Sequence, residues 1–336
     1  MSCKNTDTCD FKIDFVLPWV DGNDIEWQKD KRKYSPAKSS DDSVCRFRDW
    51  DNLQYIFRGI EKFTPWVNKV HFITYGHLPK WLNTGHPRLN IVQHKDFIDE
   101  KYLPLFSCNP FEVNLHKIPG LSEHFVYLND DIFFLKPLPR NYFFKNGLPC
   151  DTAALSVIEP FEDTVDIPVW NSVSVINKHF NKKSVIYGHL GKWFNLKYKK
   201  DLIRTICLLP WNFIPGFYRA HGPASYLKQT WETIWEKEPE ILEKTTSHRF
   251  RDTEDVAQFL FKMWQLCEGN FYPRRDKCIS VNLNLPISEI QRLILGGKHP
   301  IVCLNDRNEI KNFEKTRDDL KGILNTILPK KSTYEL

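Results

Sequence analysis

The chain has 336 residues, of which 41% are hydrophobic and 26% are charged, a composition typical of a globular protein with one large domain or two medium ones. The net charge is +5, and the charged residues are interspersed along the chain. We find no RNP motif, zinc finger or basic helix, so we expect no nucleic-acid partner. The mild positive charge suits an anionic substrate or loose attraction to an anionic membrane.

Cysteine usage and the first residues indicate the compartment. The nine cysteines are odd in number and form no CxxC pair, so free thiols in a reducing cytosol are the simplest account. Residues 1–10 form a polar tail without an apolar signal region, and no stretch approaches the ~20 apolar residues of a membrane-spanning helix. We therefore expect a cytoplasmic protein, soluble or peripheral at the inner face of the membrane.

The first predicted element is a buried strand over residues 15–17, within IDFVLPWVDG at 13–22. Pro18 ends this strand, and Asp21 to Asp24 form a predicted turn. A first strand that ends in an acidic, glycine-bearing turn often forms part of a nucleotide site in α/β proteins. A plain strand–turn–helix explains the same residues at least as well.

Alternating elements follow in the order helix, strand, strand. Apolar residues at helical spacing predict a helix over 50–62, and short apolar runs predict strands over 70–74, 89–92 and 125–128. This order predicts an α/β fold, Rossmann-like, with a mainly parallel sheet and covering helices. Residues 112–118 are predicted as a further helix, whose Glu112 and His116 share a face, as an ion pair or as ligand contacts.

Asn129, Asp130 and Asp131 follow the 125–128 strand directly. Carboxylates are costly in a core but suit the carboxyl edge of an α/β sheet, where ligands bind. Two adjacent carboxylates repel each other unless a cation lies between them and a ligand, which is how Mg²⁺ or Mn²⁺ binds a phosphate. A polar turn between two strands explains the residues equally well.

The sequence pattern changes after residue 135, where prolines interrupt the predicted elements and helices predominate. Residues 170–176 are predicted as a strand. Residues 208–218 are apolar and aromatic, and we interpret them as core by default, with an acceptor-binding wall or a membrane-surface contact as alternatives.

Two basic side chains stand ahead of predicted helices. His221 precedes a helix predicted over 226–237, and Arg251 precedes one over 256–265, positions where helix N-termini favour anions. Arg251 has the fork geometry that phosphate binding uses. A helix cap and the helix dipole suffice to explain Glu254.

Four blocks of residues, in order, resemble the Stealth family, which includes bacterial capsular-polysaccharide phosphotransferases and the catalytic subunit of lysosomal-enzyme N-acetylglucosamine-1-phosphotransferase. The resemblance extends from about residue 11 to 329. One departure is Ala224, where the family usually has a second histidine. The matching blocks are IDFVLPWVDG at 13–22, RFRD at 46–49 continuing to YLNDD at 127–131, AHGP at 220–223, and FR at 250–251 with ED at 254–255 and CLND at 303–306.

The resemblance implies transfer of a sugar-1-phosphate from a UDP-sugar to a sugar hydroxyl of an oligosaccharide or lipid-linked glycan, with release of UMP and a requirement for Mg²⁺ or Mn²⁺. It implies that Asp131, with Asp130, holds the metal, that Arg251 grips the transferred phosphate, and that His221 is the general base or a phosphate donor. The remaining expected contacts to nucleotide or donor are Asp14, Trp19, Asp21, Arg46, Asn129 and Glu254.

On this view residues 11–330 form a single catalytic domain. Its 11–135 half would bind nucleotide-sugar and metal, its helical 136–330 half would bind the acceptor and clamp phosphate, and 331–336 would be a tail. Two alternatives remain: a conventional metal-dependent glycosyltransferase that releases UDP, and a non-catalytic glycan-binding module.

Overall fold

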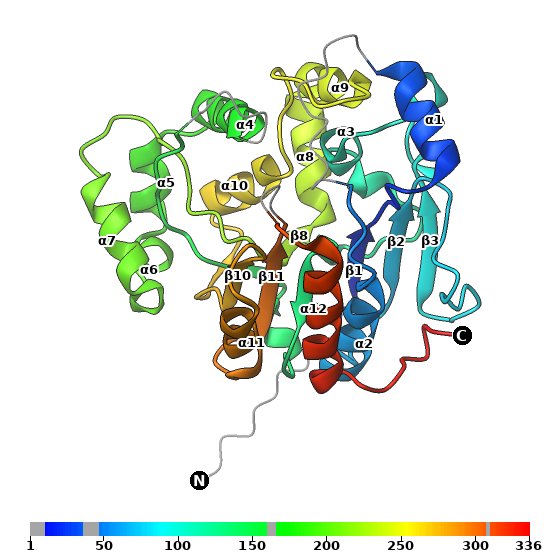
Figure 1. Cartoon of the computed structure of the whole chain (residues 1–336). Helices are drawn as coiled ribbons and strands as arrows, with labels where there is room; N and C mark the ends of the chain where they lie inside the picture. The colour runs from blue at the N-terminus through cyan, green and yellow to red at the C-terminus, as the bar shows by residue number, and fades with distance from the viewer. Residues whose placement is uncertain (1–10, 36–46, 160–165, 307–309) are drawn as a thin grey trace.

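The computed structural model describes four segments of the chain, and its central feature is a five-stranded sheet (Figure 1). The described segments are 11–35, 47–159, 166–306 and 310–336. Four strands of the central sheet run parallel, and only the last pairs antiparallel with its neighbour, which confirms the predicted α/β class. The spatial order is β3 (Leu89–Gln93), β2 (Val70–Thr74), β1 (Ile13–Pro18), β4 (His124–Tyr127) and β8 (Ala224–Leu227).

The sheet has a topological switch point between β1 and β4. From β1 the chain moves outward through β2 and β3, and then returns to place β4 on the other side of β1. Adjacent carboxyl ends diverge at such a point and leave a crevice for ligands. The residues that follow β1 and β4, Trp19 and Asn129, therefore lie at the mouth of this crevice.

A smaller sheet continues the Asn129–Asp131 segment. β5 (Ile132–Phe134) begins immediately after Asp131 and pairs antiparallel with β11 (Ile301–Asn305), which lies parallel to β10 (Cys278–Asn282). The Asp131 carbonyl accepts a hydrogen bond from the Leu304 amide at 2.8 Å. The acidic segment is therefore held between two sheets. A third sheet contains β6 (Phe144–Lys145), β7 (Leu148–Asp151) and β9 (Tyr272–Pro273).

Helices cover both faces of these sheets (Figure 1). Because side chains alternate along a strand, Phe15 and Leu17 of β1 join one hydrophobic cluster and Val16 joins the other. Both clusters combine residues from before and after position 135. The helices are α1 (Ile25–Tyr34), α2 (Leu53–Phe63), α3 (Cys108–Glu112), α4 (Asp166–His179), α5 (Lys182–Gly188), α6 (Leu190–Trp193), α7 (Lys200–Cys207), α8 (Lys228–Lys237), α9 (Pro239–Ser247), α10 (Phe259–Glu268), α11 (Ile287–Leu295) and α12 (Phe313–Ile327).

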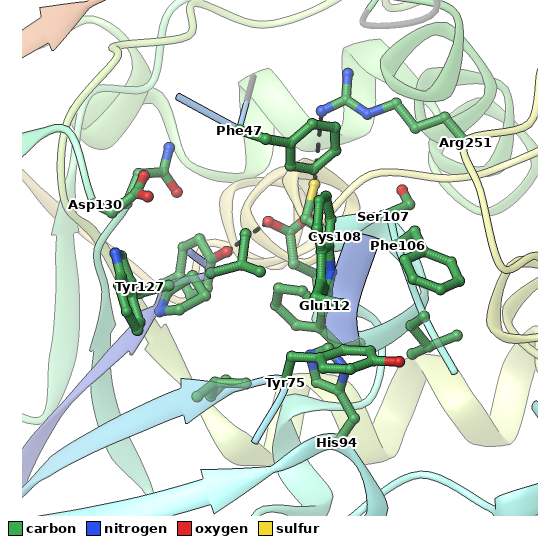
Figure 2. Close-up of a pocket in the computed structure, with 18 of the residues that line it drawn as sticks. Phe47, Tyr75, His94, Phe106, Ser107, Cys108, Glu112, Tyr127, Asp130 and Arg251 are labelled. Atoms are coloured by element: carbon green, nitrogen blue, oxygen red, sulfur yellow. Dashed lines mark hydrogen bonds between the residues drawn. The ribbon is translucent and has the colours of Figure 1, made fainter. Parts of the chain in front are cut away.

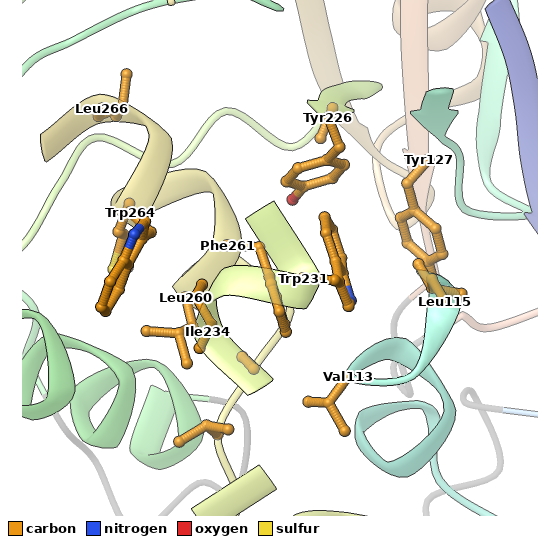
Figure 3. Packing of buried hydrophobic residues seen from close by; sticks show 14 of the residues in the cluster. Val113, Leu115, Tyr127, Tyr226, Trp231, Ile234, Leu260, Phe261, Trp264 and Leu266 are labelled. Atoms are coloured by element: carbon orange, nitrogen blue, oxygen red, sulfur yellow. The ribbon is translucent and has the colours of Figure 1, made fainter. Parts of the chain in front are cut away.

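Large aromatic side chains build the cluster that supports β4 and β8 (Figure 3). Trp231 stacks on Phe261 with ring centroids 3.8 Å apart, and Tyr226 meets Trp231 edge to face at 4.9 Å. The Trp231 indole also donates a hydrogen bond to the Glu112 carbonyl at 3.0 Å. This packing fixes the end of α3 against the sheet, and with it the Glu112 side chain.

Two element predictions were wrong. Residues 170–176, predicted as a strand, lie within α4, where Val169, Val173 and Ile176 are buried at helical spacing despite their β-branched shape. The helix predicted over 112–118 is instead the end of α3, a turn and a single 3-10 turn, so Glu112 and His116 do not share a helix face.

The helices predicted over 226–237 and 256–265 are present as α8 and α10, but both begin later than predicted. Residues 224–227 form β8, and α10 starts only at Phe259, so neither basic residue stands at a helix N-terminus. Edge strand β8 is only four residues long and is followed directly by α8. The sequence pattern of the strand was therefore read as the start of the helix. Any anion site at these positions depends on the side chains themselves.

The ends of the chain and the 208–218 segment complete the fold. The 331–336 segment packs against the body: Tyr334 is 1% exposed and Glu335 forms a 2.7 Å ion pair with Arg58. Within 208–218, Ile214 and Phe217 are buried as core, whereas Trp211 and Phe213 are exposed. None of the helices in the described part of the chain has the length and apolar character that a membrane crossing requires. The polar tail predicted at 1–10 lies outside the described residues.

Candidate active site

A cavity of about 290 Å³ opens at the carboxyl edge of the central sheet, at the switch point (Figure 2). Its walls are residues that follow β1, β2, β3 and β4, together with the α3 region and Arg251. Five predicted site residues line it together: Trp19, Asn129, Asp130, Asp131 and Arg251. The sequence separation between the first and last of these shows that the fold, and not a local motif, assembles the cavity.

Asp131 is incompletely satisfied. Its side chain is 28% exposed, yet Oδ1 is buried and has no hydrogen-bond partner among the described residues. Oδ2 accepts a hydrogen bond from the Cys303 thiol at 3.1 Å. Desolvation raises the pKa of Asp131, against which the nearby His221 and the Cys303 hydrogen bond act. A buried carboxylate oxygen without a donor is costly unless a cation or a ligand hydrogen occupies that position.

The pKa of Asp130 is also raised. Desolvation raises its pKa to about 7, and the carboxylates of Asp131 and Asp49 add to the rise. The residue remains exposed to solvent at the cavity mouth, and a cation can therefore reach it. Two carboxylates that raise each other's pKa favour a bound divalent cation, which would lower both pKa values.

His221 reaches the acidic pair from the segment before β8. Its Nε2 lies 3.8 Å from Asp131 Oδ2, and the side chain is 50% exposed. Asp131, His221 and Cys303 each offer an atom within 4.8 Å of the others, a spacing compatible with a metal. Burial and the neighbouring Asp131 raise the pKa of Cys303, so its thiol stays protonated and acts as a donor. The oxygen and imidazole groups that remain suit Mg²⁺ or Mn²⁺.

Arg251 forms the opposite wall of the cavity. Its Nη2 donates to the Cys108 sulfur at 3.8 Å (Figure 2). Glu112 lies below, where it accepts a 2.6 Å hydrogen bond from the Tyr127 hydroxyl. Burial raises the pKa of Glu112, and the charge of Arg251 acts against this rise. The cavity therefore has a cationic wall facing an acidic edge.

Aromatic side chains form the rest of the lining. Trp19 stacks on Phe72 with centroids 5.8 Å apart, and Phe106 lies roughly parallel to Tyr75 at 6.0 Å. Gly22 allows a close approach here, because a Cβ at this position would lie 2.0 Å from the Phe47 carbonyl oxygen. Flat, apolar walls of this kind suit a nucleobase or a sugar face.

Asp14 corrects the sequence prediction. It lies near the amino-terminal end of β1, is 0% exposed, and does not line the cavity. Its carboxylate accepts hydrogen bonds from Asn68, Ser122 and His71 at 2.7, 2.8 and 3.1 Å. Burial raises the pKa of Asp14, but these hydrogen bonds outweigh it, and the pKa is lowered overall. Asp14 therefore stabilises the opposite edge of the sheet and cannot reach a nucleotide.

Two other predicted contacts, Asp21 and Glu254, are not part of the cavity lining. Asp21 caps the turn after β1, where its Oδ1 accepts from the Asn23 amide at 2.8 Å. Glu254 lies on the surface in a 2.6 Å ion pair with Lys244. Arg46 falls outside the described residues.

Sequence reasoning missed several cavity residues. Cys108, Glu112 and Tyr127 line the cavity, and Cys303 and Asp49 influence its carboxylates. Glu112 was predicted to form an ion pair or a ligand contact together with His116, but His116 lies outside the cavity lining, half-buried near Trp235. Asp49 and Cys303 lie inside two of the blocks that carry the family resemblance, and that position was the available signal.

Known proteins match the chain along nearly its full length. The profiles for Stealth protein conserved region 1 and conserved region 2 match residues 11–39 and 46–151. A capsular polysaccharide phosphotransferase WcwK from Streptococcus pneumoniae is 38% identical over 96% of this chain and 98% of its own length. The receptor polysaccharide phosphotransferase WefC from Streptococcus gordonii is 37% identical over 97% and 99%.

More distant likenesses exist among solved structures and other curated relatives. An exopolysaccharide phosphotransferase cps2G from Lactiplantibacillus plantarum is 36% identical over 97% of this chain and 96% of its own. The galactosyltransferase LgtC, solved with donor and acceptor sugar analogues, covers 95% of this chain and 98% of its own at 10% identity, with a TM-score of 0.39. A score of that size does not establish a common function.

Proposed function

The chain belongs to the Stealth family, and from that premise we propose that it transfers a sugar-1-phosphate from a UDP-sugar to a sugar hydroxyl, releasing UMP, in the synthesis of a capsular or surface polysaccharide. The observation that carries the proposal is a convergence of three groups. An acidic pair, His221 and Arg251 come from distant parts of the chain to one edge of the sheet. Phosphoryl transfer depends mainly on such positioning and charge stabilisation.

The reaction we propose is an in-line displacement at the β-phosphorus. The acceptor oxygen forms a bond to that phosphorus, and the bond to the oxygen shared with the α-phosphate breaks, so UMP leaves with this oxygen. A divalent cation held by Asp130 and Asp131 would supply positive charge to the diphosphate. Arg251 stabilises the transferred phosphoryl group through its guanidinium fork.

We assign the proton of the acceptor hydroxyl to His221. Its Nε2 faces Asp131 and half of its side chain is open to solvent, so an acceptor can approach it from outside the donor cavity. The Asp131 carboxylate, whose Oδ2 lies 3.8 Å from Nε2, is placed to orient the imidazole. Trp19, Phe47 and Phe106 provide flat surfaces against which the uracil and the donor sugar pack.

The nucleotide product tests this proposal. We expect UMP when the protein is incubated with a panel of UDP-sugars, Mg²⁺ and an oligosaccharide acceptor. Release of UDP would instead identify a conventional glycosyltransferase, and binding of glycan without any nucleotide product would identify a binding module. Omission of the acceptor is the control, because it separates transfer from hydrolysis.

We also propose that the protein works in the cytoplasm at the inner face of the membrane. Helix α7 buries its polar residues Asp201 and Thr205, yet Ile203 and Ile206 are 62% and 49% exposed. Lys200 lies at the start of the same helix and is also exposed. An outward apolar face beside cationic side chains suits an anionic lipid surface.

Vesicle sedimentation tests this location. The full chain should sediment with phosphatidylglycerol vesicles and much less with phosphatidylcholine vesicles. The double substitution Ile203→Ser and Ile206→Ser should reduce sedimentation several-fold, whereas substitution of the exposed Ile25 in α1 should not. Equal sedimentation of all three proteins would contradict this location for the contact.

A further inference from the structure

A second and larger cavity, of about 1050 Å³, lies between the α6–α7 region and the loop before β10. The α6–α7 region forms the side of the molecule away from α1 (Figure 1). Residues from five separate parts of the chain line the cavity: 136–150, 197–201, 218, 272–278 and 298–300. We call this cavity the basic groove.

The charge of the basic groove is strongly one-sided. Among the described residues that line it, nine are lysine or arginine, and only Asp201 and Asp276 are acidic. This excess of seven positive charges exceeds the net charge of +5 of the whole chain, so the groove concentrates the positive charge of the molecule. A concave surface of one sign focuses the electrostatic potential and attracts ions of the opposite sign.

Arg274 is an incompletely hydrogen-bonded cation in the groove lining. Its side chain is 12% exposed and its Cζ lies 4.1 Å from the centre of the Tyr142 ring. The Asp276 carboxylate is 3.9 Å from Nη2, beyond hydrogen-bond distance. Nε and Nη1 are buried and have no hydrogen-bond partner among the described residues. A guanidinium in this state gains from an anion that enters the groove, because the anion supplies the missing acceptors.

The groove ends beside the active site. Cys278 lines it, and the Cys278 thiol donates to the His221 carbonyl at 3.1 Å. Tyr218, three residues before His221, also lines it. Close packing continues at Gly222, where a Cβ would lie 2.8 Å from Cys278 Cβ. A ligand at the Cys278 end of the groove is therefore next to the backbone of the segment that carries His221.

We propose that the basic groove binds a phosphate ester carried by the acceptor glycan and thereby presents the acceptor hydroxyl to His221. The inference rests on the proposed function, because it assigns the groove to the acceptor of that reaction. A neutral glycan would gain little from this charge. Two acceptor features share the required chemistry: the diphosphate of a lipid carrier, and the phosphodiesters of a polymer that the enzyme has already extended.

Binding measurements in EDTA test the groove without depending on activity. The variant replaces three exposed lining residues, Lys199→Ala, Lys200→Ala and Lys277→Ala. The charge-matched control removes three exposed lysines outside the groove lining, Lys237→Ala, Lys315→Ala and Lys330→Ala. The probes are octyl diphosphate, an oligosaccharide with internal phosphodiesters, and the same oligosaccharide without phosphate.

We expect the groove variant to bind at least one phosphate probe roughly tenfold or more weakly than wild type, while the control variant binds it normally. The affected probe identifies the source: octyl diphosphate indicates the lipid carrier, and the phosphodiester oligosaccharide indicates the growing polymer. Equal binding by all three proteins overturns the proposal. An equal loss for the phosphate-free oligosaccharide also overturns it, because the groove would then recognise sugar.

Nucleotide release separates this inference from the proposed function. If wild type releases UMP but the groove variant binds both phosphate probes normally, the proposed function stands and the groove assignment fails. If wild type releases no UMP but the groove variant has lost phosphate binding, the proposed function fails and the groove remains an anion site.

Discussion

The two edges of the central sheet each hold a carboxylate withdrawn from water, but the two carboxylates differ in hydrogen bonding and in the direction of their pKa shifts. At the amino edge, Asp14 is fully buried, accepts hydrogen bonds from Asn68, His71 and Ser122, and has a lowered pKa. At the carboxyl edge, Asp131 has a buried oxygen without a partner, and the pKa of both Asp131 and Asp130 is raised.

This difference distinguishes a structural carboxylate from a functional one. A fully hydrogen-bonded carboxylate contributes its interactions to folding and has no capacity left for a ligand. An under-satisfied pair costs stability in the free protein, which a cation and a substrate phosphate can recover on binding. The comparison predicts that substitutions at the two edges will damage different properties of the protein.

The largest effect should follow Asp131→Asn. Loss of one negative charge at the carboxyl edge should lower kcat for sugar-phosphate transfer by about a thousandfold. The unfolding free energy should stay within about 1 kcal/mol of wild type, because the substitution removes a poorly satisfied charge. Steady-state kinetics and urea unfolding measure the two quantities. Retention of near wild-type kcat would remove Asp131 from the mechanism.

Arg251→Ala should lower kcat by roughly a hundredfold through loss of the cationic wall. Arg251→Lys should recover only part of this loss, since an ammonium lacks the planar fork of the guanidinium. Circular dichroism of both variants controls for folding, because Glu112 would be left buried beneath the substitution. Full recovery by lysine would show that charge alone suffices.

Asp14→Asn should have the reverse profile of Asp131→Asn. We expect a loss of about 3 kcal/mol in unfolding free energy and a kcat within about twofold of wild type. Because folding lowers the pKa of Asp14, its contribution is present above the unfolded pKa of about 4 and is lost as pH falls below that value. Urea unfolding across this range should therefore show a smaller acid-dependent loss in the variant. A large fall in kcat without destabilisation would contradict the assigned role.

The smallest effect concerns the pH dependence of metal binding. A cation at the carboxyl edge must displace the proton from Asp130, whose pKa is about 7. The apparent affinity for Mn²⁺ should therefore fall about tenfold for each pH unit below 7. Titration calorimetry from pH 5 to 8 measures this slope in wild type, with Asp130→Asn as the control that should flatten it. An affinity that is independent of pH would place the metal elsewhere.

The sequence predicted the strands of the central sheet better than it predicted the residues of the candidate active site. Strands 70–74 and 125–128 were predicted within one residue because buried apolar runs bounded by turn residues are local signals. The 170–176 error arose because β-branched residues also pack at helical spacing in α4.

Within the site, residues next to strand ends could be predicted, since Trp19 and Asn129 to Asp131 follow directly from strand position. Local sequence indicated Arg251 and His221 as candidate anion contacts, but their assignment to this site required the family resemblance, because nothing local shows which sheet edge they approach. Asp14 was misassigned because it lies near the amino end of β1, whereas the cavity opens at the carboxyl end of the same strand. Its hydrogen-bond partners Asn68 and Ser122 are distant in sequence, so no local pattern indicated its structural role.

Transfer of phosphorus tests the central claim most directly. The UDP-sugar that supports turnover is labelled at its β-phosphorus and incubated with acceptor, Mg²⁺ and wild type, Asp131→Asn or Asp14→Asn protein. We predict that the label moves into the acceptor with wild type and with Asp14→Asn at a temperature where it is folded, but not with Asp131→Asn. Label that stays in UDP while the sugar is transferred would contradict the account.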